Sequence, residues 1–273
     1  MKVRTPLVCL NPLGFAAAII MAAMTHSSAA IIWTNPSTAG FSTLPLNTPT
    51  PFTFLGTGGM TMTRTSLLGS GVTLDTDSIT YAATIGSYTN PAWVIGTRSY
   101  YEVSYASGSS SPYAGSTVSY ESQFAGGLAT SSRLVFVDFD AEEEVVIKAY
   151  DLANNLIPFA STSVLLSAGA DSSPRFQDIE WASFAGATGR LRNIFVDSET
   201  NIVASISSST SIARLVYEFD LNPDNDVSNP TIRFSYAAAV PEPGQVAASL
   251  LLIGGIGGYV FLKRRNAAKP KSA

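Results

Sequence analysis

Apolar and polar residues alternate along much of the stretch from residue 31 to residue 239. Ile232, Phe234 and Tyr236, for example, are each separated by one polar residue. The same alternation recurs in two further runs, residues 101–105 and 215–219. Because successive side chains of a strand point to opposite faces, this period predicts half-buried β-strands. Many short strands separated by Gly, Ser, Asn, Asp and Pro predict an all-β domain, a single β-sandwich of jelly-roll type.

Two runs are more continuously apolar than the others. Residues 134–139 and 145–150 have the composition of central strands that are covered on both faces. Turn-forming residues at 151–155 predict a hairpin between residues 145–150 and 156–159, whose second strand is weakened by Pro158. Residues 30–51 are expected to be loose or to form a first edge strand, and the Ser- and Gly-rich segment 104–119 is expected to be an exposed loop.

The N-terminus has the pattern of a secretory signal peptide. Lys2 and Arg4 precede an apolar stretch at residues 13–24, and small residues follow at positions 28–30. This order predicts a signal peptide over residues 1–30 with cleavage after Ala30. A retained membrane anchor is the less favoured alternative, because the apolar core is short and a small-residue cleavage site follows it.

The C-terminus carries a second apolar run, residues 246–262. At about 1.5 Å of rise per residue it gives a helix of roughly 26 Å, close to the thickness of the hydrocarbon core of a bilayer. Lys263, Arg264 and Arg265 follow directly and predict a stop on the cytoplasmic side. The prediction is therefore one transmembrane helix with a short basic tail, residues 266–273, inside the cell and the bulk of the protein outside.

A short proline-containing motif precedes this helix. Pro241, Glu242 and Pro243 alone would indicate only a rigid spacer. Together with the glycine-rich helix and the basic stop, residues 240–265 resemble the PEP-CTERM sorting signal of bacterial surface proteins. The resemblance implies that an exosortase, a membrane-embedded cysteine transpeptidase, recognises the Pro-Glu-Pro motif and cleaves nearby. It further implies a bacterium that makes exopolysaccharide. The eight residues after the arginines depart from many family members, which end almost at once.

Composition excludes several kinds of chemistry in the predicted ectodomain, residues 31–239. The only cysteine, Cys9, and the only histidine, His26, lie in the predicted signal peptide. Structural disulfides, a cysteine nucleophile, a Ser-His-Asp triad and a zinc site with Cys or His ligands are therefore excluded. Nine basic against nineteen acidic residues give the ectodomain a formal charge of −10, which disfavours nucleic-acid binding. Arg190 and Arg192 form its one close basic pair.

Carboxylates are the remaining candidates for catalysis, because glycoside hydrolysis needs only a pair of them. The densest group is Asp138, Asp140 and the glutamates at positions 142–144. A strand end followed by a solvated turn explains the same pattern. We therefore expect no enzyme and no catalytic residue.

A calcium loop is a further alternative. Asp220, Asn222, Asp224 and Asp226 alternate like the first ligands of such a loop. However, Asn225 stands where the loop needs glycine and Thr231 where it needs glutamate. These four residues are weak candidates for an incidental site, and no metal or other cofactor is expected.

Three aromatic pairs could stack against sugar rings or belong to the core. They are Trp93 with Tyr88, Tyr100 with Tyr101, and Trp181 with Phe184. Aromatic side chains make up much of the core of any sandwich, so the core interpretation is favoured for each pair.

These observations favour an exported, non-catalytic surface or extracellular-matrix protein. The chain is expected to be anchored by its C-terminal helix until it is processed, and then to reside at the cell surface or outside the cell. Its expected partners are signal peptidase, an exosortase-type transpeptidase, the membrane and exopolysaccharide, with no nucleic acid. The alternative is a β-sandwich module that binds or hydrolyses exopolysaccharide.

Overall fold

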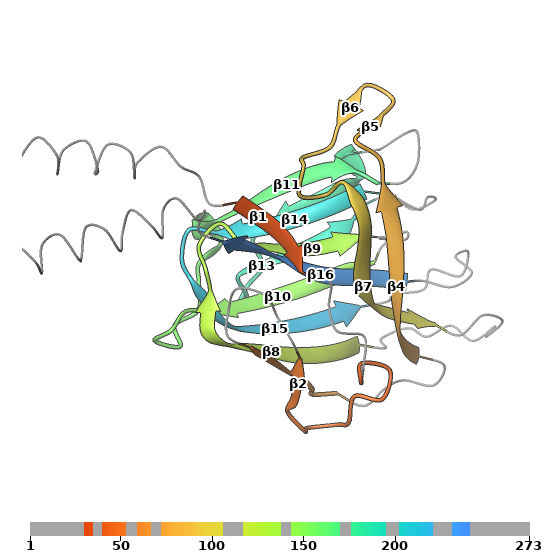
Figure 1. Cartoon of the computed structure of the whole chain (residues 1–273). Coiled ribbons are helices and arrows are strands. Elements are labelled where there is room, and N and C mark those ends of the chain that lie inside the picture. Colours follow the sequence, from red (N-terminus) through yellow and green to blue (C-terminus); the bar gives the residue numbers. More distant parts are fainter. Residues whose placement is uncertain are drawn as a thin grey trace, which may run out of the picture. The chain divides into compact units, whose positions relative to one another are not determined.

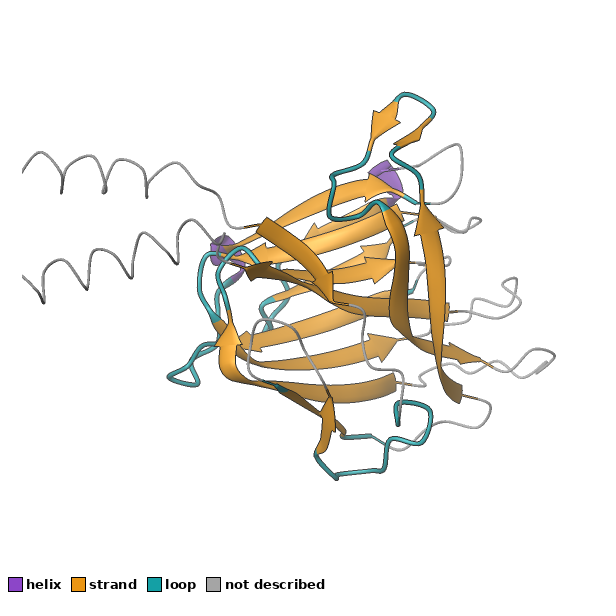
Figure 2. Cartoon of the chain, viewed as in Figure 1, coloured by secondary structure: helices purple, strands orange, loops and turns teal. Residues whose placement is uncertain are grey.

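The computed structural model describes residues 30–34, 40–52, 59–66, 72–105, 117–137, 143–169, 176–194, 202–220 and 231–240. The chain divides into two compact units, one of which, Ile31–Val240, contains all but the first of these residues. Regular structure in this part is almost entirely β-strand (Figure 2), with two single-turn 3-10 helices, η1 (Phe159–Ser161) and η2 (Phe176–Asp178). No helix among the described residues has the length and apolarity needed to cross a membrane.

Two antiparallel sheets of seven strands each form the domain (Figure 1). Sheet A has the order β11 (Thr162–Ala168), β14 (Ile202–Ser208), β9 (Arg133–Val137), β16 (Thr231–Val240), β7 (Gly96–Tyr105) and β4 (Val72–Tyr81), and β1 (Ala30–Thr34) pairs with β16. Sheet B has the order β12 (Ile179–Ala182), β13 (Gly189–Asn193), β10 (Glu144–Tyr150), β15 (Ile212–Asp220), β8 (Thr117–Leu128), β3 (Met60–Arg64) and β2 (Thr50–Phe52). A separate hairpin joins β5 (Thr84–Ile85) to β6 (Tyr88–Thr89).

The chain crosses repeatedly between the two sheets. Each strand from β8 to β12 lies in the sheet opposite its predecessor, and the same is true of β14, β15 and β16. These connections join two antiparallel sheets, as in a β-sandwich. The all-β prediction is thus confirmed, and the two runs predicted as central strands form β9 and β10, each with a partner on both sides.

Aromatic side chains fill the space between the sheets. The alternation predicted around residues 232–236 is confirmed, because Ile232, Phe234 and Tyr236 of β16 are all buried. The ring of Phe234 lies 5.1 Å from Phe219 and 5.6 Å from Tyr217, both on β15 of the opposite sheet. Sequence alternation therefore translates directly into ring contacts between the two layers.

A chain of hydroxyl groups also crosses the core. The Tyr217 hydroxyl donates to that of Tyr236 over 3.1 Å, and Tyr236 shares a hydrogen bond of 2.9 Å with the Ser122 hydroxyl. Burial raises the pKa of Tyr236 to about 12, and it raises that of Tyr217 as well. Both phenols are therefore neutral at physiological pH, and their mutual hydrogen bonds offset the cost of removing them from water.

The outer face of sheet A carries a second, smaller apolar layer. Trp33 of β1 is buried there, stacks on Trp93 at 5.7 Å and donates from its indole nitrogen to the Ser99 carbonyl over 3.4 Å. The Arg98 guanidinium lies 5.7 Å from the Trp33 ring, and Arg133 lies 5.5 Å from the Trp93 ring. The resulting Arg-Trp-Trp-Arg stack holds the first strand of the domain onto the sheet.

Two local predictions need correction. The turn after β10 does not lead into a second strand, because Leu156 makes only an isolated bridge to Tyr150 before Pro158 directs the chain into η1. The partners of β10 are instead β13 and β15. In the segment predicted as a loop, residues 104–119, Ser104 belongs to β7 and β8 begins at Thr117, while residues 106–116 lie outside the described residues. Residues 30–51, predicted to be loose or a first edge strand, supply β1 and the first two residues of β2, which is an edge strand of sheet B.

The central position of Phe234 makes it a test of the inter-sheet core. Phe234→Ala should lower the free energy of unfolding by about 3–5 kcal/mol, because it removes a ring that is 1% exposed and leaves a cavity. Denaturant unfolding of the protein measures this loss. Phe184→Ala removes a ring that is 38% exposed and serves as the control. An equal loss in both variants would show that Phe234 has no special place in the core.

Candidate functional site

An open groove lies along the end of sheet B. Its volume is about 720 Å³, within the range of small-molecule sites. The floor is apolar and includes Phe52, Met60 and Phe124, which are buried beneath it. Polar groups of the rim come from Asp151 and Asn154 in the turn after β10 and from Arg214 on β15. The groove is therefore amphipathic, and Thr61 and Gln123 add further polar groups to its lining.

The turn at Asp151 is held by its own carboxylate. That group accepts hydrogen bonds from the backbone N–H groups of Ala153 and Asn155 at 2.9 and 2.8 Å, and from the Asn155 amide at 3.2 Å. These bonds, with the backbone N–H of Asn155 first, lower the pKa of Asp151 below its usual value. Asn154 sits in the left-handed region with φ of 62°, which Asn tolerates better than most residues.

Arg214 connects this turn to the sheet. Its guanidinium lies 3.7 Å from the centre of the Tyr150 ring, donates to the Asn154 side chain over 2.9 Å and pairs with Glu121 at 3.3 Å. These three contacts hold the guanidinium in one position. The polar rim is thus organised before any ligand arrives, and the sequence offered no indication of it because Glu121, Asn154 and Arg214 are far apart along the chain.

This arrangement suits binding better than hydrolysis. Glycosidases need two carboxyl groups, one of them an acid with a raised pKa. Of the described residues that line the groove, Asp151 alone carries a carboxylate, and its pKa is lowered instead. The described lining therefore offers no carboxyl group with the raised pKa of such an acid.

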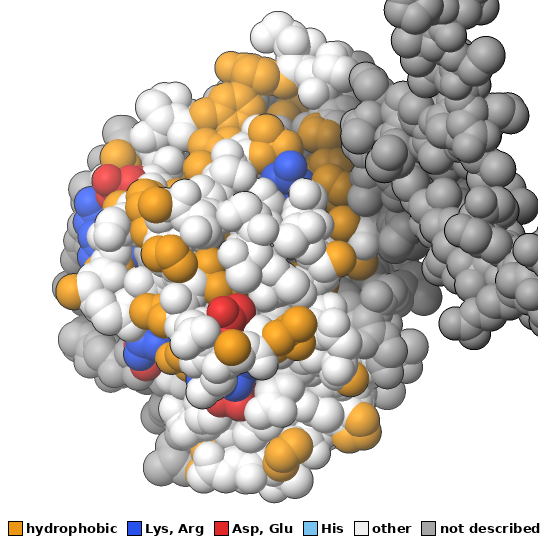
Figure 3. All heavy atoms as spheres, turned by 90° about the vertical axis from the view of Figure 1, so that its left-hand side faces the viewer, with side chains coloured by type: hydrophobic (Ala, Val, Ile, Leu, Met, Phe, Trp, Pro, Cys, Tyr) orange, Lys and Arg blue, Asp and Glu red, His pale blue; other side chains and the backbone are white. Residues whose placement is uncertain are grey.

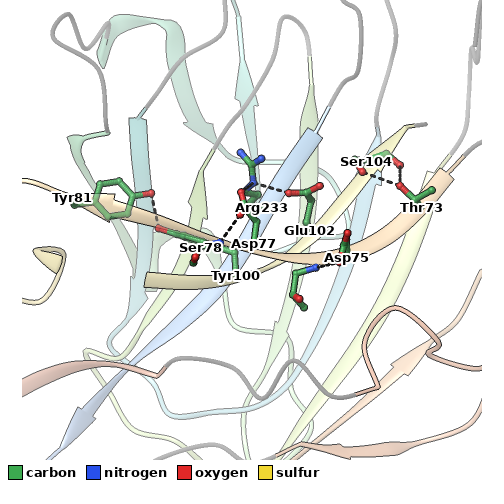
Figure 4. A network of polar contacts seen from close by, with 10 residues as sticks. Thr73, Asp75, Asp77, Ser78, Tyr81, Tyr100, Glu102, Ser104 and Arg233 are labelled. Carbon is green, nitrogen blue, oxygen red and sulfur yellow. Dashed lines mark hydrogen bonds and ion pairs between the residues drawn. The ribbon is translucent and has the colours of Figure 1, made fainter. Parts of the chain in front are cut away.

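A polar network covers the outer face of β4, β7 and β16 (Figure 4). Arg233 lies between two acidic side chains, 2.8 Å from Glu102 and 3.1 Å from Asp77. Beside it, Thr73 and Ser104 share a hydrogen bond of 2.9 Å, and the Tyr100 hydroxyl donates to that of Tyr81 over 2.6 Å. Arg233 thus compensates part of the acidic charge that the strand sequences place on this face.

The outer face of sheet B is a set of cross-strand ion pairs. Arg192 lies 2.7 Å from Glu180, Arg190 lies 3.4 Å from Glu144, and Lys148 lies 3.7 Å from Glu218. Arg190 and Arg192, predicted as a local basic pair, are therefore each neutralised by a glutamate. On the side of the molecule in Figure 3, some acidic and basic groups lie side by side and others stand apart, and apolar side chains form patches among uncharged polar atoms. Neither the outer face of sheet B nor the face in Figure 3 is a continuous basic surface of the kind that attracts a polyanion.

The aromatic candidates belong to the packed interior or to its margin. Tyr100 and Tyr101 are both fully buried. Trp93 stacks on Trp33, and Tyr88, which is exposed, packs its ring edge-on against Phe176 at 4.7 Å. None of these forms an open platform with its predicted partner.

Trp181 closes one edge of the sandwich. Its indole nitrogen donates to the Thr162 hydroxyl of β11 over 3.1 Å, and its ring lies against Gly189, where a Cβ would be only 2.3 Å away. Phe184 is exposed but lies under the Arg190 guanidinium, 5.0 Å away. Trp181 is thus a structural contact between sheets A and B.

The glutamate run was predicted to be a solvated tip, and this is wrong for two of its members. Glu143 is completely buried, and its backbone carbonyl accepts from the Asn193 N–H over 3.0 Å. Glu144 begins β10 and pairs with Arg190. The strand starts one residue earlier than its hydrophobicity indicates, since ladder pairing with β13 and β15 begins at Glu144.

Several predicted residues lie outside the described residues. They are Asp138, Asp140 and Glu142, the calcium candidates Asn222, Asp224 and Asp226, the sorting motif Pro241, Glu242 and Pro243, and the membrane stop Lys263, Arg264 and Arg265. Asp220 ends β15, but its side chain is not described. Within the described part of the chain, no group of three or more acidic, Cys or His side chains is arranged to hold a metal ion.

Comparison with known proteins gives no family. No protein-family model matches the chain, and no curated protein matches its sequence. Among solved structures, the enzymatically active domain of tailspike protein 4 of bacteriophage CBA120 matches 75% of this chain with 13% identity and a TM-score of 0.30. The match covers 21% of that protein's chain, so this chain spans about a fifth of its length. A likeness so distant carries no argument about activity.

The lowered pKa of Asp151 predicts how the groove turn responds to pH. A carboxylate with a depressed pKa stabilises the fold above the unfolded-state value of about 3.9, and this contribution is lost as the pH falls through the folded-state pKa. Asp151→Ala should therefore be less stable than the unchanged protein at neutral pH, with the difference shrinking on acidification. Denaturant unfolding across the acidic range measures it. Leu152→Ala, in the same turn, should show no such pH dependence. A difference that stays constant with pH would contradict the assignment.

Proposed function

We propose that this chain is an exported, non-catalytic surface or extracellular-matrix protein that is sorted through its C-terminal Pro-Glu-Pro motif, transmembrane helix and basic stop. In this proposal signal peptidase cleaves after Ala30. An exosortase-type transpeptidase then recognises Pro241, Glu242 and Pro243 and cleaves nearby, so that the sandwich is released or transferred. The domain acts through its surface, among extracellular polysaccharide.

The ends of the described fold carry this proposal. Strand β1 begins at Ala30, beside the predicted signal-peptidase site, and β16 ends at Val240, one residue before Pro241. These two strands pair with each other. Cleavage at both places would leave the two sheets and their core in place. The domain could therefore be released as a folded unit.

The surface of the sandwich supports a role without catalysis. The charged groups of sheet B form cross-strand ion pairs. On sheet A, Arg233 forms ion pairs with both Asp77 and Glu102. The aromatic residues that could have formed a sugar platform are packed, with Trp93 against Trp33 and Trp181 against Gly189. Paired charges and packed aromatic side chains are features of a soluble and stable domain, and they favour a role outside the cell that does not involve catalysis.

A second candidate, saccharide binding without hydrolysis, rests on the groove. An apolar floor beside a fixed guanidinium, an amide and a carboxylate is a chemically reasonable surface for a sugar ring and its hydroxyls. The groove has no exposed aromatic face among its described lining residues, because Phe52 and Phe124 are buried. This absence places binding second to the display role.

The mass of the mature protein tests the sorting proposal. In the native bacterium, material from the extracellular fraction should begin at Ile31 and end near residues 241–243. Glu242→Gln should leave the chain full length at its C-terminus and retained in the membrane fraction. Intact-mass spectrometry of both fractions measures the two ends.

The matched control is Glu218→Gln, an exposed glutamate of β15 that pairs with Lys148. This variant should be processed as the unchanged protein is. A C-terminus that remains at Ala273 in the unchanged protein, or processing that survives Glu242→Gln, would refute recognition of the motif. Material that starts upstream of Ile31 would refute cleavage after Ala30.

A further inference from the structure

The two sheets have four open edges along their strand order, and three of them carry a feature that discourages pairing with another chain. Edge strand β4 presents Asp75 and Asp77 on its outer face. Edge strand β12 has only four residues and includes Glu180, and β2 has only three residues and includes Pro51. Charge, short length and proline are the usual means by which proteins block strand addition at a sheet edge.

The fourth edge, β11, has none of these features. Its sequence, Thr-Ser-Val-Leu-Leu-Ser-Ala, contains no charge, no proline and no glycine over seven residues. Val164 is 38% exposed and Leu165 is 37% exposed, so apolar side chains reach solvent on both faces of the strand. Among the described strands, β14 pairs with β11, Trp181 of β12 bonds to Thr162 at its first residue, and β6 of the neighbouring hairpin also lies close to it.

The backbone of this edge is oriented for pairing. The Ser161 carbonyl accepts from the Ser209 N–H over 2.9 Å, in register with the pairing of β11 and β14. Because backbone groups of successive residues point to opposite sides of an antiparallel strand, residues 163, 165 and 167 bond to β14. The N–H and C=O groups of Val164 and Leu166 consequently point away from sheet A.

The residue order of the edge is self-complementary. Ser163, Val164, Leu165, Leu166 and Ser167 read almost the same from either direction around Leu165. In an antiparallel pair centred on Leu165, serine lies opposite serine and Val164 lies opposite Leu166. The outward-pointing backbone groups then meet as hydrogen-bonded pairs, and the two Leu165 side chains lie together where no backbone bonds intervene.

We propose that two copies of this chain associate through β11, in antiparallel register about a two-fold axis at Leu165. Sheet A then runs continuously through both copies. The contact is isologous and closes on itself, so it yields a dimer and not a fibre. A second copy fits this edge because it is uncharged and matches itself, whereas nothing along it could select a charged partner. The inference does not depend on how the C-terminus is processed.

Cysteine cross-linking in membranes that contain the full chain tests this contact. Leu165→Cys places two thiols at directly opposed positions, where Cβ atoms of a non-hydrogen-bonded pair are about 4.5–5.5 Å apart and near disulfide distance. Mild oxidation should therefore convert this variant to a dimer that reductant separates. Leu152→Cys, at the groove and 69% exposed, is the control and should remain monomeric.

A second change separates the edge contact from association through any other part of the chain. Val164→Pro removes an N–H that points away from the sheet and leaves the β11–β14 bonds in place. In the Leu165→Cys background it should abolish the cross-link while thermal unfolding is nearly unchanged. The proposal is overturned if Leu165→Cys cross-links no better than Leu152→Cys, or if the cross-link persists with Val164→Pro.

Discussion

Burial of aromatic side chains between two sheets is the interaction on which the rest of this structure depends. Residues 31–239 contain no cysteine and no histidine, so neither a disulfide nor a zinc site with Cys or His ligands supplements the core. Phe234 and Tyr236 from sheet A instead meet Tyr217 and Phe219 from sheet B, and the phenol hydroxyls bond to one another. Every strand must keep its register for these rings to interdigitate, because a slip of one residue would turn them toward solvent.

The same requirement shapes the outer faces. Each strand that turns rings inward turns its intervening residues outward, and on sheet B these form pairs such as Arg190 with Glu144 and Arg192 with Glu180. Exposed pairs of this kind contribute little to stability, on the order of 0–1 kcal/mol each. Their main consequence is to leave a water-exposed face of balanced charge. The first strand of the domain is held by an apolar contact instead, because Trp33 stacks on Trp93 and keeps β1 against sheet A.

Much of the fold could be predicted from sequence periodicity, and the failures have physical causes. The inward positions of Ile232, Phe234 and Tyr236 were correctly predicted because period-two alternation reports the burial of one face. Glu143 was predicted to be solvated but is buried, directly before β10, where its carbonyl bonds to Asn193 at the end of β13. Short-range reasoning also paired β10 with the chain that follows it, although its partners β13 and β15 lie dozens of residues away.

The groove and the β11 edge could not have been predicted in the same way. Arg214 reaches Glu121, Asn154 and Tyr150 only because β8, β15 and the turn after β10 meet at one end of sheet B. Likewise, the uncharged run at residues 162–168 suits an edge or a centre of a sheet equally well, and only the strand order leaves it at an edge. The sequence by itself determined the strand pattern, the absence of thiol and imidazole chemistry, and the export and sorting expectations, because these depend on composition and local order. Strand neighbours, ion pairs and open edges were decided by the tertiary structure alone, because each depends on which distant segments the shared core brings together.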